Sequence, residues 1–145
     1  EEQPSSKVLQ LFLNSLYMLA KTDKSPKLIT RIFEIRLMAI LGYAPSVSGC
    51  IKCGREDFKD FHFSFKHCGF LCKQCIGDDM YAFKLSEGAA RAIHYIVYSK
   101  MKNIFNFEVS GPILIELEKV SKRYIRDRLD KEYNKLDFLK NLNQT

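Results

Sequence analysis

GCIKCGREDFKDFHFSFKHCGFLCKQC, residues 49–75, contains all five cysteines of the 145-residue chain. Four of them form two Cys-x-x-Cys pairs, with 18 residues between the pairs. A Cys-x-x-Cys turn points two sulfurs at one centre, and two such turns can close a tetrahedron around a metal ion that favours soft ligands. Gly54, directly after the first pair, suits the tight turn that such a pair needs. The spacing therefore predicts a structural Zn²⁺ site, with the ligands Cys50, Cys53, Cys72 and Cys75.

Three other interpretations of these cysteines stay open from the sequence. A disulfide framework would need an oxidising compartment, and five cysteines leave one unpaired. An iron centre on four cysteines has the same spacing, and cysteines that bind nothing are the third alternative. A catalytic zinc is not expected, because it needs an open coordination position and four thiolates fill the shell.

The fifth cysteine and the three histidines need separate interpretation. Cys68 and the neighbouring His67 could each replace one of the four ligands. We expect Cys68 to be instead a small buried or half-buried residue beside Gly69. His62 alternates with phenylalanines and is expected on the more exposed face of a strand. His94 lies in a helical pattern and is expected to be a surface or hydrogen-bonded histidine.

Helical patterns precede the cysteine-rich stretch. Residues 3–21 carry apolar side chains at three- and four-residue steps, namely Val8, Leu9, Phe12, Leu13, Leu16, Leu19 and Ala20. A second helix is predicted from Ser25, which can cap it, through Pro26 in its first turn. Gly42 can close this helix in a left-handed conformation. Its apolar side chains cover a wide arc, which predicts a central and mostly buried helix.

The helical period disappears between about residues 46 and 81. FHFSF, residues 61–65, alternates aromatic and polar side chains with the two-residue period of a strand. GFLC, residues 69–72, predicts a short partner strand. Helical patterns return at residues 85–101 and 109–136, and a short amphipathic tail, KLDFLKNL, follows. We therefore predict a mainly α fold, a bundle of four to five helices in a single domain over residues 1–145. A small four-cysteine zinc-finger insert with short β-strands interrupts it at about residues 46–81.

The chain has a formal net charge of +6 and a pI near 9.1, which favours an anionic partner such as nucleic acid. A Zn²⁺ ion on four thiolates adds −2, so the charge would fall to about +4. In the last long helix, four cations share one face at i, i+3, i+4 and i+7: Lys119, Lys122, Arg123 and Arg126. We predict that this face contacts DNA phosphates. The alternative is a solvated face with i,i+4 ion pairs.

Several other classes of protein lack support in the sequence. It contains no phosphate-binding Gly-rich loop, no His-Glu-x-x-His motif and no nucleophile elbow, so no enzyme is expected. The longest apolar runs are too short to span a membrane. No secretory signal is recognisable at the start. The first residue is Glu1, which suggests a piece of a longer chain.

The order of these motifs resembles the C-terminal domain of the RecO family, bacterial recombination mediators of DNA repair. The resemblance rests on FEIRLMAILGYAP (residues 33–45), CIKCG (50–54), FHFSF and GFLCKQC (69–75), and covers nearly the whole chain. It implies a helical domain with a zinc-finger-like insert, and its metal ligands correspond to Cys50, Cys53, Cys72 and Cys75. Cys68 stands where family members usually have glycine.

The resemblance also implies a function. The family binds single- and double-stranded DNA without sequence preference, anneals complementary strands, works with RecR, and helps load RecA onto DNA coated by single-strand-binding protein. It also binds the acidic, apolar tail of that protein through the helical domain. Its members are cytoplasmic, associated with the nucleoid during repair. An N-terminal OB-fold domain precedes the helical domain, and no barrel pattern appears here, so we expect that domain to be absent from this chain.

Two functional hypotheses follow. The first is a non-enzymatic DNA-repair domain that contacts DNA directly. The second is a protein-interaction module that docks RecR or the tail of single-strand-binding protein without touching DNA. A small zinc-dependent enzyme is a third and weaker alternative.

Overall fold

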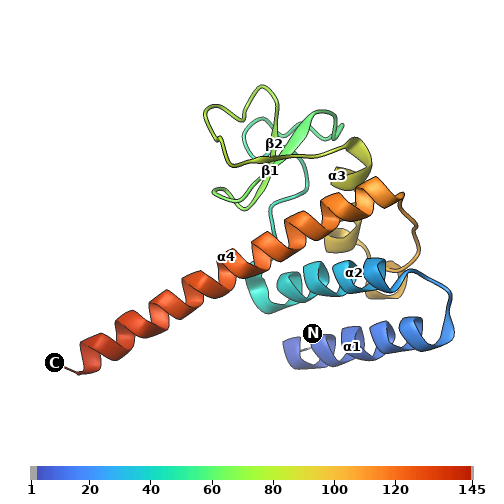
Figure 1. Ribbon diagram of the computed structural model, residues 1–145, viewed down its shortest axis with the longest axis horizontal. Coiled ribbons are helices and arrows are strands. Elements are labelled where there is room, and N and C mark those ends of the chain that lie inside the picture. The colour runs from blue at the N-terminus through green and yellow to red at the C-terminus, as the bar shows by residue number, and fades with distance from the viewer. Residues whose placement is uncertain (1–2, 145) are drawn as a thin grey trace.

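The computed structural model describes residues 3–144 and consists mainly of helices (Figure 1). The helices are α1 (Pro4–Lys21), α2 (Pro26–Met38), α3 (Glu87–Tyr98) and α4 (Gly111–Asn143). Two short helical turns, η1 (Ala39–Tyr43) and η2 (Met101–Asn103), and three strands, β1 (Phe61–Ser64), β2 (Gly69–Cys72) and β3 (Phe83–Lys84), complete the fold. In Figure 1, α2 lies between α1 and α4, and the small sheet lies on the other side of α4. The predicted fold class, mainly α with a small stranded insert, is confirmed.

Helix α2 is the central element of the bundle, as predicted. It buries five side chains, Leu28, Ile29, Ile32, Ile35 and Met38. Its start is capped by Ser25, whose hydroxyl accepts a hydrogen bond from the Leu28 amide at 3.3 Å. At its end, η1 forms one π-helical turn in which Gly42 has φ +93°. Glycine adopts this left-handed conformation without steric cost, so the chain can turn away from the bundle into the insert.

The insert folds around a three-stranded antiparallel sheet with the strand order β2-β1-β3. The predicted strands at residues 61–65 and 69–72 are β1 and β2, paired with Phe61 opposite Cys72 and Phe63 opposite Phe70. The two-residue strand β3 was not predicted, because two residues carry no periodic signal. At Gly69 a β-carbon would collide with the carbonyl oxygen of Ser46, so only glycine allows the chain before the first cysteine pair to lie this close to β2.

Phenylalanines of the insert belong to the same hydrophobic core as the helices and join the insert to the bundle. Phe58, Phe61, Phe63 and Phe70 are buried and pack edge to face, with ring centroids 5.5–6.3 Å apart. Phe63 also meets Tyr124 of α4 at 5.7 Å between centroids. The hydroxyl of Tyr124 donates a hydrogen bond of 2.7 Å to a carbonyl of η1. The insert therefore packs against α4 through shared aromatic side chains.

An arginine of α2 closes the end of α3. The Nη1 of Arg36 donates to the carbonyl oxygens of Ile96, Val97 and Ser99 at 3.0, 3.1 and 2.7 Å. These carbonyls lie at and just beyond the last turn of α3, where they have no partner within the helix. Burial lowers the pKa of Arg36, yet arginine remains charged in proteins. Arg36 thus acts as a C-terminal cap that couples two helices.

We expect Arg36→Met to lower the free energy of unfolding by about 1.5–3 kcal/mol, because it keeps the apolar stem and removes hydrogen bonds from a charged donor. Urea denaturation followed by circular dichroism measures this loss. Arg91→Met is the matched control. Arg91 is exposed and forms an i,i+4 pair with Glu87, a long hydrogen bond of 3.4 Å to the Asp57 carbonyl and a contact over the Phe58 ring. Its loss should change stability by about 0–1 kcal/mol. Equal losses in the two variants would contradict the capping role.

Two helices differ from the sequence-based expectation, α1 in how few of its apolar side chains it buries and α4 in where it ends. Helix α1 buries only Leu11 and Ser15. Its apolar stripe is largely exposed: Leu9, Phe12, Leu13, Leu16 and Leu19. The C-terminal tail is not a separate segment but continues α4 to Asn143. Within residues 3–144, none of the helices combines the length and the apolar character needed to cross a membrane.

Candidate metal centre

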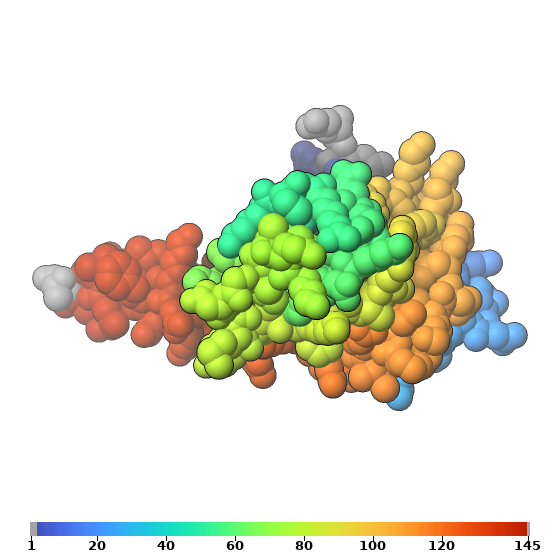
Figure 2. Space-filling model, turned by 90° about the horizontal axis from the view of Figure 1, so that it is seen from above, coloured from blue at the N-terminus to red at the C-terminus, as the bar shows by residue number. Residues whose placement is uncertain are grey.

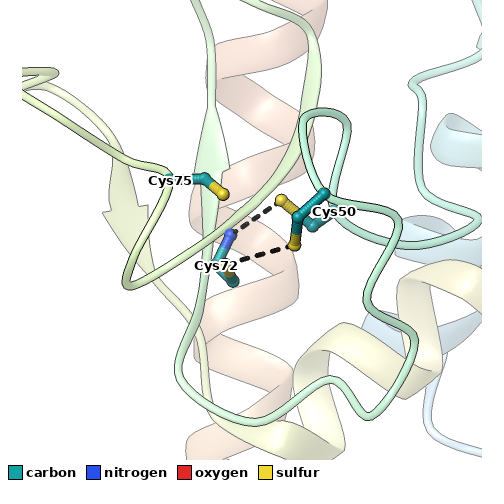
Figure 3. Close-up of side chains that lie close together, drawn as sticks. Cys50, Cys72 and Cys75 are labelled. Atoms are coloured by element: carbon teal, nitrogen blue, oxygen red, sulfur yellow. Dashed lines mark hydrogen bonds between the residues drawn. The ribbon is translucent and has the colours of Figure 1, made fainter.

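The two cysteine pairs meet at one edge of the insert. The sulfurs of Cys50, Cys53, Cys72 and Cys75 all lie within 4.8 Å of one another. Figure 3 shows the side chains of Cys50, Cys72 and Cys75 converging on one region between the two loops. Cys50 and Cys72 are buried, Cys75 is half-buried and Cys53 is exposed, so the cluster reaches from the core of the insert to its surface.

The first pair lies in a tight loop fixed to the sheet. The Cys50 amide donates to the Arg55 carbonyl at 2.8 Å, and the Gly54 amide donates to the Cys50 carbonyl at 2.9 Å. Gly54, predicted to suit this tight turn, has φ +77°, a left-handed conformation that glycine adopts without steric cost. The Ile51 amide donates to the carbonyl of Phe70 in β2 at 2.9 Å. These backbone bonds orient the first two sulfurs toward the second pair.

The second pair begins on β2 and continues into a turn. Cys72 is the last residue of β2, and the Cys75 amide donates back to its carbonyl at 3.0 Å. The Cys72 amide also donates to the sulfur of Cys50 at 3.4 Å. Outside the cluster, Nη1 of Arg55 donates to the side-chain oxygen of Gln74 at 3.2 Å and ties the two loops together. No spacing rule in the sequence could have predicted this last contact.

Electrostatics inside the cluster favour a bound cation. Burial raises the pKa of Cys50, but hydrogen bonds from backbone amides, those of Cys53 and Cys72 first, outweigh it and lower that pKa to about 6. The pKa of Cys75 is raised to about 12, first by its hydrogen bond with Cys72 and then by burial. Thiols this close cannot all ionise by themselves, because each thiolate disfavours the next. A divalent cation removes that conflict and stabilises all four thiolates.

The arrangement of the four sulfurs fits a tetrahedral metal ion. A Zn–S bond of about 2.3 Å places the sulfurs of a regular tetrahedron about 3.8 Å apart. The sulfurs of Cys53 and Cys72 are 3.7 Å apart, whereas a disulfide bond is about 2.05 Å long. All five cysteines are free thiols. The cluster could thus hold a metal ion with four ligands; that this ion is zinc stays a prediction.

Cys68 lies apart from the cluster, in the turn between β1 and β2. Its sulfur accepts a hydrogen bond from Nη2 of Arg128 at 2.9 Å. The Arg128 guanidinium also lies over the rings of Tyr43 and Tyr124. Cys68 has φ +56°, the conformation in which glycine is unstrained. Cys68 is half-buried beside Gly69, as expected, but its contact with α4 has no signal in the sequence.

The three histidines also lie apart from the four sulfurs. His67 is exposed in the β1–β2 turn. His62 is only half-buried, and its Nδ1 has no hydrogen-bond partner within residues 3–144. Burial, and then the nearby Lys84, lowers the pKa of His62. The Nδ1 of His94 lies 2.9 Å from the carbonyl oxygen of Val47. His94 is thus a hydrogen-bonded helix residue, as expected.

The predicted cationic face of α4 divides into two parts. Lys119 and Arg123 lie against the insert, over the rings of Phe83 and Phe65 at 5.8 and 4.2 Å from the centroids. Lys122 and Arg126 are exposed on the adjacent part of the helix. Lys122 also pairs with Glu118 at 2.6 Å, and Arg123 pairs with Asp127 at 3.7 Å. Together with Lys119 over Phe83, three of the four cations therefore have an acidic or aromatic contact. Their role in DNA binding stays a prediction.

Comparison with known proteins identifies the family. Residues 1–137 match the family model described as "Recombination protein O C terminal". The chain belongs to the RecO family. It is 60% identical over 144 residues to the DNA repair protein RecO of Acetivibrio thermocellus, a match that covers 99% of the chain and 57% of that relative. It is 29% identical over 143 residues to RecO of Alkaliphilus metalliredigens, covering 98% and 58%. RecO of Bacillus subtilis is 27% identical over 128 residues, covering 88% and 49%.

The match to the RecO family concerns one part of its members. The chain spans about half to three-fifths of the length of these relatives. The structure therefore describes the RecO C-terminal part, with its helices and its four-cysteine cluster.

Proposed function

We propose that this chain is the C-terminal helical domain of a RecO-type recombination mediator, a non-enzymatic protein of bacterial DNA repair. Residues 1–145 form the domain, and the insert at about residues 46–81 is folded by a structural Zn²⁺ ion on Cys50, Cys53, Cys72 and Cys75. Membership of the RecO family supports the role in DNA repair. Four cysteine ligands would leave no open coordination position, which supports a structural rather than hydrolytic metal.

We further propose that the domain contacts DNA directly, through phosphates. The observation that supports this contact is the row of Lys119, Lys122, Arg123 and Arg126 along one face of α4, in a protein of net charge +6. Lysine and arginine side chains in such a row bind phosphates without reading bases. Binding would be independent of sequence and sensitive to salt, and would serve both single- and double-stranded DNA.

The wider roles rest on the family resemblance and concern the full-length protein. They are annealing of complementary strands, cooperation with RecR, and loading of RecA onto DNA coated by single-strand-binding protein. The site of action would be the bacterial cytoplasm, at the nucleoid during repair.

Reversing two exposed charges of α4 tests the DNA contact. We expect Lys122→Glu with Arg126→Glu to weaken single-stranded DNA binding and to reduce the slope of log K against log salt by about 1.4, since each lost phosphate contact contributes about 0.7. Fluorescence anisotropy over a salt titration measures both. Arg123 is left in place because it packs over Phe65.

The matched control reverses two exposed lysines of α1, Lys7→Glu with Lys21→Glu, on the far side of α2 from α4 (Figure 1). This control changes the net charge of the protein by the same amount as the double variant in α4. It should leave the slope of log K against log salt nearly unchanged. Equal slopes in both double variants, or no binding by the wild type at low salt, would contradict direct contact through α4.

A second candidate function is docking of a peptide, and one feature favours it. Helices α1 and α2 form an apolar groove of about 130 Å³, lined mainly by Phe12, Leu16, Leu19, Ile29 and Phe33. An apolar groove between helices suits the apolar residues of a peptide, such as the tail of single-strand-binding protein. If the domain binds this tail but no DNA at low salt, the second function replaces the first.

A further inference from the structure

The last part of α4 extends beyond the rest of the protein. Figures 1 and 2 show this end of the helix projecting away from the bundle and the insert. The last buried residue of α4 is Tyr124, and every residue from 133 to 144 is exposed. Most of the stability of a protein helix comes from packing of an apolar face, and short isolated helices are marginal in water. We therefore expect that another apolar surface packs against this projecting segment and stabilises it.

The projecting end carries an apolar stripe suited to such a partner. Leu129, Tyr133 and Leu136 follow one another at i, i+4 and i+7, so they lie on one face. Their exposed fractions are 63%, 69% and 58%. Side chains of this size gain most when another apolar surface covers them.

The part of RecO proteins that lies outside this chain is the partner best placed to cover the stripe. In the Acetivibrio relative, the 144 matched residues are 57% of the length, which leaves roughly 110 residues, enough for one folded domain. Because the matched family model is the C-terminal one, these residues precede the match. Helix α1 begins on the side of the molecule toward which α4 projects (Figure 1). A domain joined to the start of α1 would therefore lie on the same side of the molecule as the end of α4.

We propose that the stripe of Leu129, Tyr133 and Leu136 is the docking surface for the N-terminal part of the same polypeptide. A second copy of the chain is a weaker partner on two grounds. A stable dimer buries about 800 Å² on each partner, more than a single row of three side chains supplies. A tethered domain also acts at an effective concentration in the millimolar range.

Docking at this place would have a structural consequence. The stripe begins one turn after Arg126, on the same continuous helix. Helix α4 would then fix the orientation of the N-terminal part relative to the cationic face, because the docking stripe and this face lie on the same helix.

Site-specific photo-crosslinking in the full-length protein tests the proposal. The crosslinking residue p-benzoyl-phenylalanine replaces Tyr133, or Tyr17 on the outer face of α1, or Tyr98 at the end of α3. These tyrosines are 69%, 62% and 53% exposed, so none of the replacements disturbs the core. Mass spectrometry then locates the linked peptides. We expect Tyr133 alone to give intrachain links to residues that precede Glu1, in a yield at least about tenfold above that at Tyr98.

Two results would overturn the proposal. One is a link from Tyr133 to a second copy, recognised by a doubled mass that depends on protein concentration. The other is a set of links to the N-terminal part from Tyr17 and none from Tyr133, which would place that part on α1. As a second measurement, Leu129→Asp with Leu136→Asp should abolish the Tyr133 link, whereas Ile115→Asp, on the same helix and 55% exposed, should leave it intact. Persistence of the link in the first variant would also count against the proposal.

Discussion

Replacing Cys72 with serine is expected to release the metal from the four-cysteine cluster and to disorder the cysteine loops of the insert. Cys72 is the most buried of the four cysteines, with 1% of the residue exposed, and a serine hydroxyl is a poor ligand for a soft metal site. Loss of a partner outside the ligand shell already weakens metal binding about 10- to 100-fold, so loss of a ligand should weaken it by more than about 100-fold. Elemental analysis and competition with a chromophoric chelator measure this change.

The fifth cysteine supplies the control. Cys68→Ser removes a thiol of the same insert that lies outside the cluster and contacts Arg128. It should keep one metal ion per chain. A Cys72→Ser protein with its full metal content, or a wild-type protein whose cysteine loops stay ordered without metal, would refute the structural site. Iron in place of zinc in the elemental analysis would keep the site and change its metal.

Local patterns made much of this fold predictable. The cap at Ser25 involves a neighbour three residues away and forms as expected, with a hydrogen bond of 3.3 Å. The left-handed turn at Gly42 is likewise fixed by a single residue. The cysteine pairs were predictable because each lies in a tight turn, so their spacing restricts where the sulfurs can point.

What the sequence did not reveal depends on contacts between distant segments. The apolar stripe of α1 indicated a helix correctly, but periodicity cannot tell whether another element covers that stripe. Arg36 and Arg128 gave no signal, because their partners lie 60 or more positions away in the chain. The prediction that four cations share one face of α4 was correct, because it depends only on helical spacing. The sequence could not show that Arg123 would turn toward Phe65 and the insert.

Metal and aromatic core stabilise different parts of the insert. The cysteine loops have few buried apolar side chains besides the ligands Cys50 and Cys72, and Ile51 is 43% exposed. The sheet, in contrast, is filled with phenylalanines that reach α4 through Phe63 and Tyr124. Removing the metal should therefore disorder the loops first, and the aromatic core should resist longer.

A core substitution at saturating metal separates the two contributions. We expect Phe70→Ala to lower the free energy of unfolding by about 3–5 kcal/mol, the usual cost of deleting a fully buried aromatic side chain. Phe70 is 0% exposed and lies within 6.3 Å, centroid to centroid, of Phe58, Phe61 and Phe63. Urea unfolding with zinc in excess measures the loss. Phe138→Ala is the control, because Phe138 is 62% exposed on the end of α4 and should change stability by less than about 0.5 kcal/mol. If Phe70→Ala cost less than about 1 kcal/mol while zinc stayed bound, the metal alone would hold the insert together; a loss in the expected range shows that the sheet is packed as part of the protein's main core.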